Sequence, residues 1–317
     1  MFEVIVVQKR HEAEGVCSFE LCRGDGQPLP AFTAGAHIDV RVSVDITRQY
    51  SLCNSPLERD RYLIGVLHEA MSRGGSRGMH ERIGVGDRLS ISAPKNHFPL
   101  TTGARKSILL GGGIGITPVL AMAFQLAHEG AEFELHYCVR DPRRAAFLQL
   151  IAASGFADNL YMHFDTGERH QLLDLNHVLA EPRADTHLYV CGPNGFMDYV
   201  INTAHGLGWP IEQIHREYFA ASSVVHDVDQ AFEVELAESG LVLEVPTDKS
   251  VLDVLCASGI ELPSSCRQGV CGACMTPVIE GVPDHRDVFM SDKEHALNDQ
   301  FTPCCSRSKT RRLVLAL

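Results

Sequence analysis

The sequence lacks an apolar run long enough to cross a membrane. No uninterrupted apolar stretch approaches the ~18 residues that span a bilayer as a helix. The opening run Met1-Phe2-Glu3-Val4-Ile5-Val6-Val7 has neither the basic start nor the small-residue cleavage site of a signal peptide, and its pattern favours a β-strand. The chain also has no internal repeat and no low-complexity tract. We therefore expect a globular cytoplasmic protein.

An excess of basic residues is also missing. The 28 lysines and arginines face 40 acidic residues, which gives a formal net charge of -12. Residues 1–103, 104–225 and 226–317 contribute 0, -5 and -7 to that charge. This balance disfavours nucleic acid as a partner. An acidic surface on the last section would either steer the protein towards a basic patch on a partner protein or only keep it soluble.

Disulfide-type cysteine spacing is absent from most of the chain. Six of the 11 cysteines are scattered among apolar residues, as buried free thiols in a reducing compartment are. These six are Cys17, Cys22, Cys53, Cys138, Cys191 and Cys256.

The remaining cysteines have an informative spacing. Cys266, Cys271 and Cys274 are separated by gaps of four and two residues, and the adjacent pair Cys304 and Cys305 follows about thirty positions later. This is the spacing of thiolates that hold a plant-type [2Fe-2S] cluster. Zinc sites usually combine two CxxC or CxxH pairs, and the sequence offers only one such pair here. Neighbouring side chains of an extended segment point to opposite faces, so only one of the last two cysteines can be the fourth ligand.

Residues 1–103 read as short strands separated by turns, which predicts an antiparallel β-barrel. The expected strands cover 4–8, 17–22, 37–42, 49–52, 62–66 and 88–92. On one of them Arg48, Tyr50 and Ser51 offer a phosphate partner, a flat ring and a hydroxyl, a combination that suits a flavin nucleotide. The polar loop 72–80, which includes Gly75 and Ser76, precedes an expected short helix and resembles a phosphate site at a helix N-terminus.

Residues 104–225 change to alternating strands and helices, which predicts a parallel sheet. The expected strand 107–110 runs into the loop 111–118, and a helix is expected at 119–128. Strand, glycine loop and helix together form the unit that cradles a dinucleotide pyrophosphate. The loop is not a GxGxxG motif, because position 116 is isoleucine and the motif closes with Pro118. Further strands are expected at 133–139, 160–164 and 187–191.

Residues 226–317 predict a small β-grasp ferredoxin fold. The run 220–227 has the composition of a linker and suggests a hinge. Strands are expected at 231–236 and 242–245, and a helix at 250–258, before the cysteine loop. The chain should therefore contain an N-terminal barrel domain, an α/β domain and a C-terminal iron–sulfur domain, divided at residues 103 and 225.

Several stretches, taken in this order, resemble the phthalate dioxygenase reductase family over essentially the whole chain. They are 48–52, 111–118, 191–193, the cysteine spacing and the run Asp284-His285-Arg286-Asp287. Stretches 48–54 and 298–307 look most like reductase components of aromatic O-demethylases. The resemblance implies a ferredoxin reductase-like module that binds FMN and NADH, fused to a plant-type ferredoxin.

The resemblance also implies roles for individual residues. Arg48, Tyr50, Ser51, Gly75 and Ser76 would bind FMN, and Phe219 would cover its ring. The nicotinamide and pyrophosphate would be surrounded by Gly113, Gly115, Thr117, Pro118, Cys191, Gly192 and Pro193. Cysteine ligands to the cluster would be Cys266, Cys271, Cys274 and Cys304.

The expected activity follows from electron counts. NADH gives up two electrons as hydride and a [2Fe-2S] cluster accepts one, so a flavin between them has to hold two and release them singly. No catalytic acid or base is needed, and we expect His37, His68, His80, His136 and His163 to be structural. The acceptor would be a Rieske-type oxygenase, either an aromatic O-demethylase or a phthalate or carnitine enzyme. The alternative is a non-catalytic iron–sulfur redox sensor, which would not need the 111–118 loop.

Overall fold

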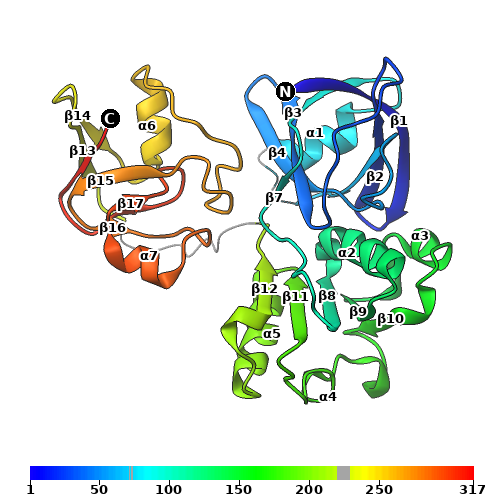
Figure 1. The fold of residues 1–317 in the computed structure, drawn as a ribbon. Helices are drawn as coiled ribbons and strands as arrows, with labels where there is room; N and C mark the ends of the chain where they lie inside the picture. Colours follow the sequence, from blue (N-terminus) through cyan, green and yellow to red (C-terminus); the bar gives the residue numbers. More distant parts are fainter. Residues whose placement is uncertain (71, 73, 220–228) are drawn as a thin grey trace. The chain divides into compact units, whose positions relative to one another are not determined.

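The structure is a computed structural model that describes residues 1–70, 72, 74–219 and 229–317 (Figure 1). Contacts divide the chain into two compact units, Met1–Glu217 and Tyr218–Leu317. The expected linker at 220–227, and with it the boundary after residue 225, lies outside the described residues. The boundary expected after residue 103 falls inside the first unit and stays a prediction. Among the described helices, none is both long and apolar enough to cross a bilayer.

The first part of unit 1 is the antiparallel barrel predicted from the sequence. Its strands follow the order β4-β3-β6-β1-β2-β5, with β7 beside β3. A bridge between Leu52 and Ile64 connects the β4 end of this sheet to β5 and closes the barrel. The bounds are β1 Phe2–Ala13, β2 Val16–Cys22, β3 Ala36–Ser43, β4 Ile46–Ser51, β5 Tyr62–Leu67, β6 Arg88–Ile91 and β7 Lys95–Asn96.

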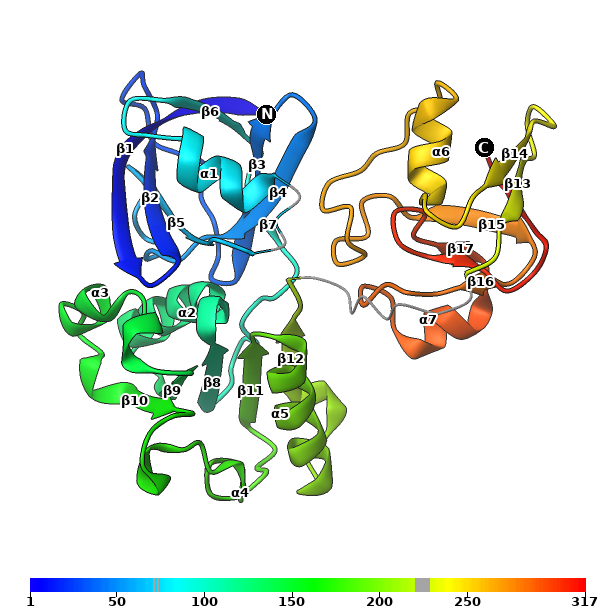
Figure 2. The same cartoon turned by 180° about the vertical axis from the view of Figure 1, so that it is seen from behind.

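Helix α1 (Gly75–Arg82) packs against β3, β4 and β5, as Figure 2 shows. The sequence analysis placed the 72–80 loop before this helix, whereas the helix begins inside the loop at Gly75. Gly74, the N-cap, has a φ of 92°, which is readily available only to glycine. Gly75 and Ser76 therefore belong to the first turn, where backbone N–H groups lack helical partners.

The second part of unit 1 is a parallel sheet in the order β10-β9-β8-β11-β12. Its strands are β8 Lys106–Gly112, β9 Glu132–Val139, β10 Leu160–Phe164, β11 Thr186–Cys191 and β12 Ile214–Glu217. The helices are α2 Ile116–Glu129, α3 Leu148–Ala152, α4 Leu175–Val178 and α5 Asn194–Gly206. Strand β8 runs two residues further than expected, and a 3-10 turn at Gly113–Gly115 leads directly into α2. Because β8 and β11 are neighbours, with Gly111 beside Cys191, the loops that follow them meet.

The barrel and the parallel sheet pack without spare room at Gly65 of β5. A Cβ atom added to Gly65 would lie 2.8 Å from the Phe147 ring and 2.8 Å from the Thr117 methyl group. Phe147 is itself 1% exposed and belongs to the apolar core that surrounds α2. This contact fixes the barrel strand β5 against the start of α2, so that the flavin face and the nucleotide loop are held in one unit.

Unit 2 confirms the predicted β-grasp ferredoxin fold. Its sheet has the order β14-β13-β19-β15-β17, and β13 runs parallel to β19. The bounds are β13 Phe232–Leu236, β14 Val242–Val245, β15 Thr276–Glu280, β16 Pro283–Asp284, β17 Gln300–Phe301, β18 Arg307–Ser308 and β19 Arg312–Leu315. Helix α6 (Val251–Ala257) starts at a capping box between Ser250 and Asp253, and α7 (Asp292–Leu297) starts at one between Ser291 and Glu294. Both helices begin where these polar caps take up free backbone N–H groups.

Candidate functional site

Arg48 of β4 lies against the start of α1. A Cβ atom on Gly75 would come within 2.6 Å of the Arg48 side chain, and Arg48 Nη1 donates a hydrogen bond to the Thr47 carbonyl at 2.8 Å. The first turn of α1 contains no acidic residue, and Ser72 Oγ accepts a hydrogen bond from the Arg77 N–H at 3.3 Å. A guanidinium beside free N–H groups at a helix start is a chemical match for a phosphate. The predicted flavin-phosphate residues are therefore brought together.

The other residues predicted to bind the flavin differ in burial and in hydrogen-bond partners. Tyr50 is half-buried, and burial raises its pKa, so its phenol stays protonated. Ser76 sits in the first turn of α1, where its hydroxyl oxygen accepts a hydrogen bond from the Glu69 N–H at 3.1 Å. Ser51 is 5% exposed and directs its hydroxyl to Glu217. Phe219 lies two residues beyond β12 with 37% of its surface exposed, and its place over a flavin stays a prediction.

The sequence analysis missed Glu217, the last residue of β12. Ser51 Oγ donates a hydrogen bond to Glu217 Oε2 at 3.4 Å, and Glu217 is paired in register with Cys191 at the end of β11. Part of Glu217 reaches the surface, but its carboxyl group is enclosed by protein atoms, and this burial raises the pKa of Glu217 to about 8. An acidic residue at the carboxyl end of a parallel strand was the signal available in the sequence.

Cys191 completes this group. Its side chain is fully buried, and burial, followed by the charge of Glu217, raises the pKa of the Cys191 thiol well above its usual range. The thiol is therefore neutral at physiological pH and is no thiolate nucleophile. A serine hydroxyl, a thiol and a protonated carboxyl thus lie together at the edge where the barrel meets the carboxyl ends of β11 and β12. Such a group can hold a proton and donate hydrogen bonds to a planar ring.

The loops after β8 and β11, where a nucleotide cradle is predicted, lie next to each other. Gly113 has a φ of 55°, and a Cβ there would meet no atom within 4 Å, so its backbone is open. Gly115 is tightly packed, because a Cβ would lie 2.2 Å from the Cys191 carbonyl oxygen. Gly192 lies against Gly112, and exposed Pro193 is the N-cap of α5, whose first turn has no acidic residue. Open glycine backbone between two helix starts fits a pyrophosphate.

Thr117 and Pro118 contribute differently from the glycines. Both lie in the first turn of α2 and are buried. Thr117 Oγ1 donates to the Ile114 carbonyl at 3.0 Å, so the hydroxyl stabilises the turn rather than pointing outward. Pro118 has no N–H to leave unsatisfied in this first turn. These two residues shape the loop, and any direct contact of theirs with a nucleotide stays a prediction.

Replacing Glu217 with glutamine is expected to flatten the pH dependence of unit 1 stability. The folded protein keeps the Glu217 proton up to about pH 8, whereas the unfolded chain loses it near 4.5, so the free energy of unfolding falls as pH rises between these values. Glutamine has no such proton, and the variant should be more stable near pH 8 by about 1–2 kcal/mol, discounted for partial solvent access. The measurement is urea unfolding followed by Trp209, the single tryptophan, which is buried in unit 1.

The exposed Glu212 supplies the matched control. Glu212→Gln removes a carboxyl from the preceding turn, where it faces solvent, and should leave the pH profile of the wild type unchanged. Parallel profiles for Glu217→Gln and wild type would show that the Glu217 carboxyl is ionised in the folded state.

The four predicted cluster cysteines converge in unit 2. Cys266, Cys271, Cys274 and Cys304 have exposed fractions of 4, 9, 4 and 9%. The Cys266 thiol lies within hydrogen-bonding reach of the Cys271 and Cys304 thiols. The Cys274 thiol lies within the same reach of Cys304. A tight set of four buried thiols on one loop and one distant segment is the donor set of a [2Fe-2S] cluster.

The loop that carries three of these thiols depends on unusual backbone angles. Arg267, Gly269 and Gly272 have φ values of 53, 73 and 66°. Gly272 cannot carry a side chain, because a Cβ would lie 2.3 Å from the Phe289 ring. The Gln268 N–H donates to Cys266 Sγ at 3.3 Å, which is the kind of N–H to sulfur contact that tunes a cluster. Glycine at positions 269 and 272 lets the loop wrap tightly around a ligand.

Cys305 occupies a different environment from Cys304. Its thiol lies 3.2 Å from Thr302 Oγ1, and a Cβ on Gly269 would come within 2.5 Å of Cys305 Sγ. Cys304 is buried together with Cys274 and Leu252, and Cys305 is a partly buried neighbour that packs against this cluster. The geometry thus favours Cys304 as the fourth ligand, in agreement with the resemblance.

The histidines expected to be structural make intramolecular contacts. His136 Nδ1 lies 3.0 Å from His163 Nε2, and their rings stack with centroids 5.3 Å apart. His80 Nε2 bonds the Val66 carbonyl at 2.8 Å, and His37 Nε2 lies 3.1 Å from the Gln49 amide. His68 packs edge-on against His80. These contacts fit the structural role expected of the five side chains, which stays a prediction.

Comparison with known proteins agrees with this arrangement. Residues 234–309 match the model of the 2Fe-2S iron-sulfur cluster binding domain. The chain is 55% identical to the vanillate O-demethylase oxidoreductase of Pseudomonas putida, covering 100% of both sequences. It is 43% identical to the phthalate 4,5-dioxygenase oxygenase reductase subunit of Pseudomonas putida, covering 98% of this chain and 95% of the relative.

A solved structure supports the same assignment. Phthalate dioxygenase reductase, described as a modular structure for electron transfer from pyridine nucleotides to [2Fe-2S], superimposes with a TM-score of 0.81 at 38% identity, over 100% of this chain and 98% of the other. The fold predicted for all parts of the chain is thereby confirmed. The likeness of stretches 48–54 and 298–307 to O-demethylase reductases agrees with the 55% identity. The chain belongs to the phthalate dioxygenase reductase family of oxidoreductases, with a C-terminal domain that binds a [2Fe-2S] cluster.

Proposed function

We propose that the chain is an NADH-dependent reductase component that passes electrons through FMN and a [2Fe-2S] cluster to a Rieske-type terminal oxygenase, an aromatic O-demethylase of the vanillate type. The observation that carries the proposal is the presence of three sites on one chain. They are the phosphate-binding corner at Arg48, the open glycine cradle at Gly113 and the four converging thiols. The substrate class rests on the 55% identity to a vanillate O-demethylase oxidoreductase.

The residues of unit 1 bind and orient the two nucleotides. Arg48 of β4 and the N-terminus of α1 would hold the flavin phosphate, and Tyr50 and Ser51 of the same strand would contact the flavin ring. Bound flavin supplies the conversion of a two-electron hydride donor into single electrons. Glu217 is protonated and lies beside Ser51, so its carboxyl group adds no negative charge to this edge of the site. A hydride moving there would meet no carboxylate.

The glycine loops and the cysteine loop complete the proposed path. Gly113, Gly115, Gly192 and Pro193 present backbone groups to the pyrophosphate and nicotinamide of NADH. Cys266, Cys271, Cys274 and Cys304 hold the cluster as thiolates and shield it from water through their burial. The free thiols elsewhere in the described chain suit a reducing cytoplasm, and the net charge of -12 disfavours nucleic acid.

Anaerobic addition of NADH to the purified protein tests the redox activity. Loss of flavin absorbance followed by loss of cluster absorbance is expected, and absence of bleaching would favour the redox sensor. The partner is tested separately by mixing the reduced protein with purified oxygenase components. Fast reoxidation by a vanillate-type component, with NADH-dependent demethylation, supports the proposal, and a preference for a phthalate- or carnitine-type component would reassign the substrate.

Replacing Arg48 with alanine is expected to weaken FMN binding by about 1.5–3 kcal/mol, the usual worth of a charge-assisted hydrogen bond. This loss corresponds to roughly 10- to 150-fold in the dissociation constant. Flavin fluorescence after dialysis measures the retained fraction. Arg41→Ala on the adjacent strand β3 is the control, because the Arg41 side chain is exposed and donates to Met1 Sδ at 3.6 Å. Unchanged flavin retention in Arg48→Ala would remove this residue from the site.

A further inference from the structure

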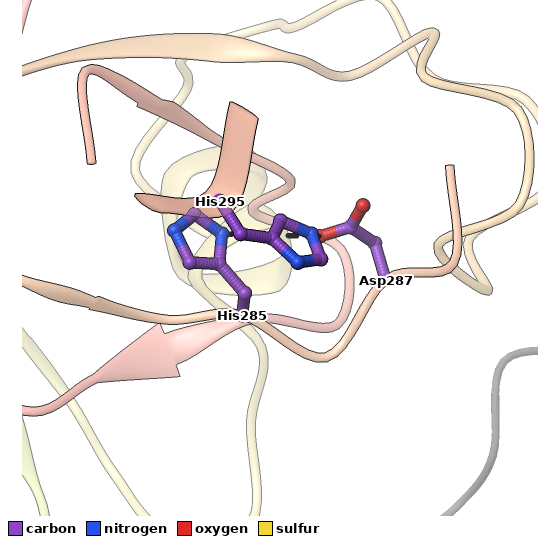
Figure 3. Close-up of side chains that lie close together, drawn as sticks. All are labelled: His285, Asp287 and His295. Atoms are coloured by element: carbon purple, nitrogen blue, oxygen red, sulfur yellow. Dashed lines mark hydrogen bonds and ion pairs between the residues drawn. The ribbon is translucent and has the colours of Figure 1, made fainter. Parts of the chain in front are cut away.

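Three side chains with metal-binding atoms lie close together next to the cysteine loop of unit 2. His285 and Asp287 follow β16, and His295 projects from α7 (Figure 3). Each offers one ligand atom, and these atoms all lie within 4.8 Å of one another. His295 Nε2 is 3.2 Å from Asp287 Oδ1, and His285 Nδ1 is 3.9 Å from the same oxygen. One carboxylate oxygen therefore faces two imidazoles.

Burying the polar side chains of His285 and Asp287 costs free energy unless their polar atoms find partners. The Asp287 side chain is fully buried and that of His285 is 8% exposed. Within the described residues, neither ring nitrogen of His285 reaches a partner in hydrogen-bonding geometry. Burial, followed by the neighbouring His295, lowers the pKa of His285, against the opposing effects of Asp287 and Asn298. The imidazole is thus neutral and carries a nitrogen lone pair that can serve as a metal ligand.

Of the charged groups that act on His285, Asp287 favours a cation and Lys309 opposes one. Asp287 Oδ2 accepts the Met290 N–H at 2.8 Å, which leaves Oδ1 directed at the histidines. The neighbouring Arg286 does not oppose a cation strongly, because it is neutralised by Asp229 at 2.6 Å and Asp284 at 2.7 Å. The local donor set is therefore two imidazole nitrogens and one carboxylate oxygen.

We propose that His285, Asp287 and His295 form a mononuclear site for a divalent transition-metal ion of the zinc class, distinct from the [2Fe-2S] centre. Two nitrogens and one oxygen are ligands that Zn²⁺ accepts, with water completing the coordination. The two rings stack with centroids 4.4 Å apart and an interplanar angle of 19°. Binding turns the rings out of this stack so that one nitrogen of each points at the ion. His285 is not held by a hydrogen bond, and His295 exchanges its bond to Asp287 for the metal.

A metal ion bound at this site would change the surroundings of the [2Fe-2S] cluster. A Cβ on Gly269 would lie 3.0 Å from Asp287 Cα, so the two backbones are in contact. The Val288 N–H also donates to the Gly269 carbonyl at 3.0 Å. Gly269 belongs to the loop between Cys266 and Cys271, and a shift of Asp287 on metal binding therefore changes the surroundings of the cluster.

The test uses untagged holoprotein that retains its flavin and cluster, titrated with Zn²⁺ by calorimetry. One Zn²⁺ per chain is expected, with no loss of cluster iron, and the visible circular dichroism of the cluster should change on binding. His285→Gln and His295→Gln should each weaken binding by at least about tenfold. His170→Gln, an exposed histidine next to Glu168 in unit 1, is the matched control and should bind as the wild type does.

Two outcomes would overturn the site. Absence of stoichiometric binding to the wild type would show that the histidine stack is only structural. Equal binding by wild type and the double variant His285→Gln/His295→Gln would place the ion elsewhere. The cluster absorbance of each variant, recorded before titration, shows whether unit 2 is folded, and the His295→Gln variant, whose side chain is 23% exposed, is the less disruptive of the two.

Discussion

Replacing Cys304 with alanine is expected to abolish the [2Fe-2S] cluster, whereas replacing Cys305 is expected to leave it in place. A two-iron centre needs four thiolates, and loss of one ligand from a buried site leaves an iron without a protein donor. The Cys304 thiol is within reach of Cys266 and Cys274, while Cys305 is directed to Thr302 and Ser306. The measurement is electron paramagnetic resonance of the reduced protein together with iron content.

The adjacent pair provides its own control, because Cys305→Ala makes the same chemical change one residue away. Cys305 lies against Gly269, so its removal leaves a small gap beside the cysteine loop and should shift the signal without removing it. If Cys304→Ala kept the cluster and Cys305→Ala lost it, the ligand register would be wrong by one residue. Loss in both variants would show that the segment 302–306 has to pack intact before the cluster assembles.

The choice between Cys304 and Cys305 shows what cysteine spacing in the sequence cannot predict. Gaps between cysteines identify a cluster loop, because three thiols on a short loop can converge only with few intervening residues. The spacing does not say which of two adjacent cysteines faces inward. That is decided by the path of the chain after β17, where Phe301 and Thr302 are fully buried and set the direction of the next side chains. Such packing is a property of the folded unit.

Glu217 illustrates a second limit. The strands and the glycine loop were predictable from local patterns, since apolar alternation and glycine spacing act over a few residues. The hydrogen bond from Ser51 to Glu217 joins positions 166 residues apart. Its existence depends on the barrel edge meeting the end of β12, which no local pattern encodes. The pairing of His285 with His295 arises in the same way, from α7 folding back over the segment after β16.

Replacing Gly115 with alanine is expected to reduce the rate of flavin reduction by NADH by about a hundredfold or more, the effect of a roughly 1 Å misplacement of a reacting group. The added Cβ would lie 2.2 Å from the Cys191 carbonyl oxygen and 2.6 Å from the Gly192 nitrogen. Both contacts are with backbone, so no side-chain rotation relieves them. Since Gly115 has an ordinary helical φ of -62°, the effect comes from space alone and not from backbone strain.

Stopped-flow absorbance under anaerobic conditions measures this rate, and photochemical reduction of the flavin shows whether the rest of the protein still transfers electrons. Gly206→Ala is the matched control, because Gly206 is the last residue of α5, at the end opposite the nucleotide loops, and a Cβ there meets no atom within 4 Å. Intact Trp209 fluorescence and flavin content in Gly115→Ala would confine the damage to the nucleotide loops. A wild-type rate in that variant would mean that the loops after β8 and β11 can move apart without cost, and that the nicotinamide is not positioned by their contact.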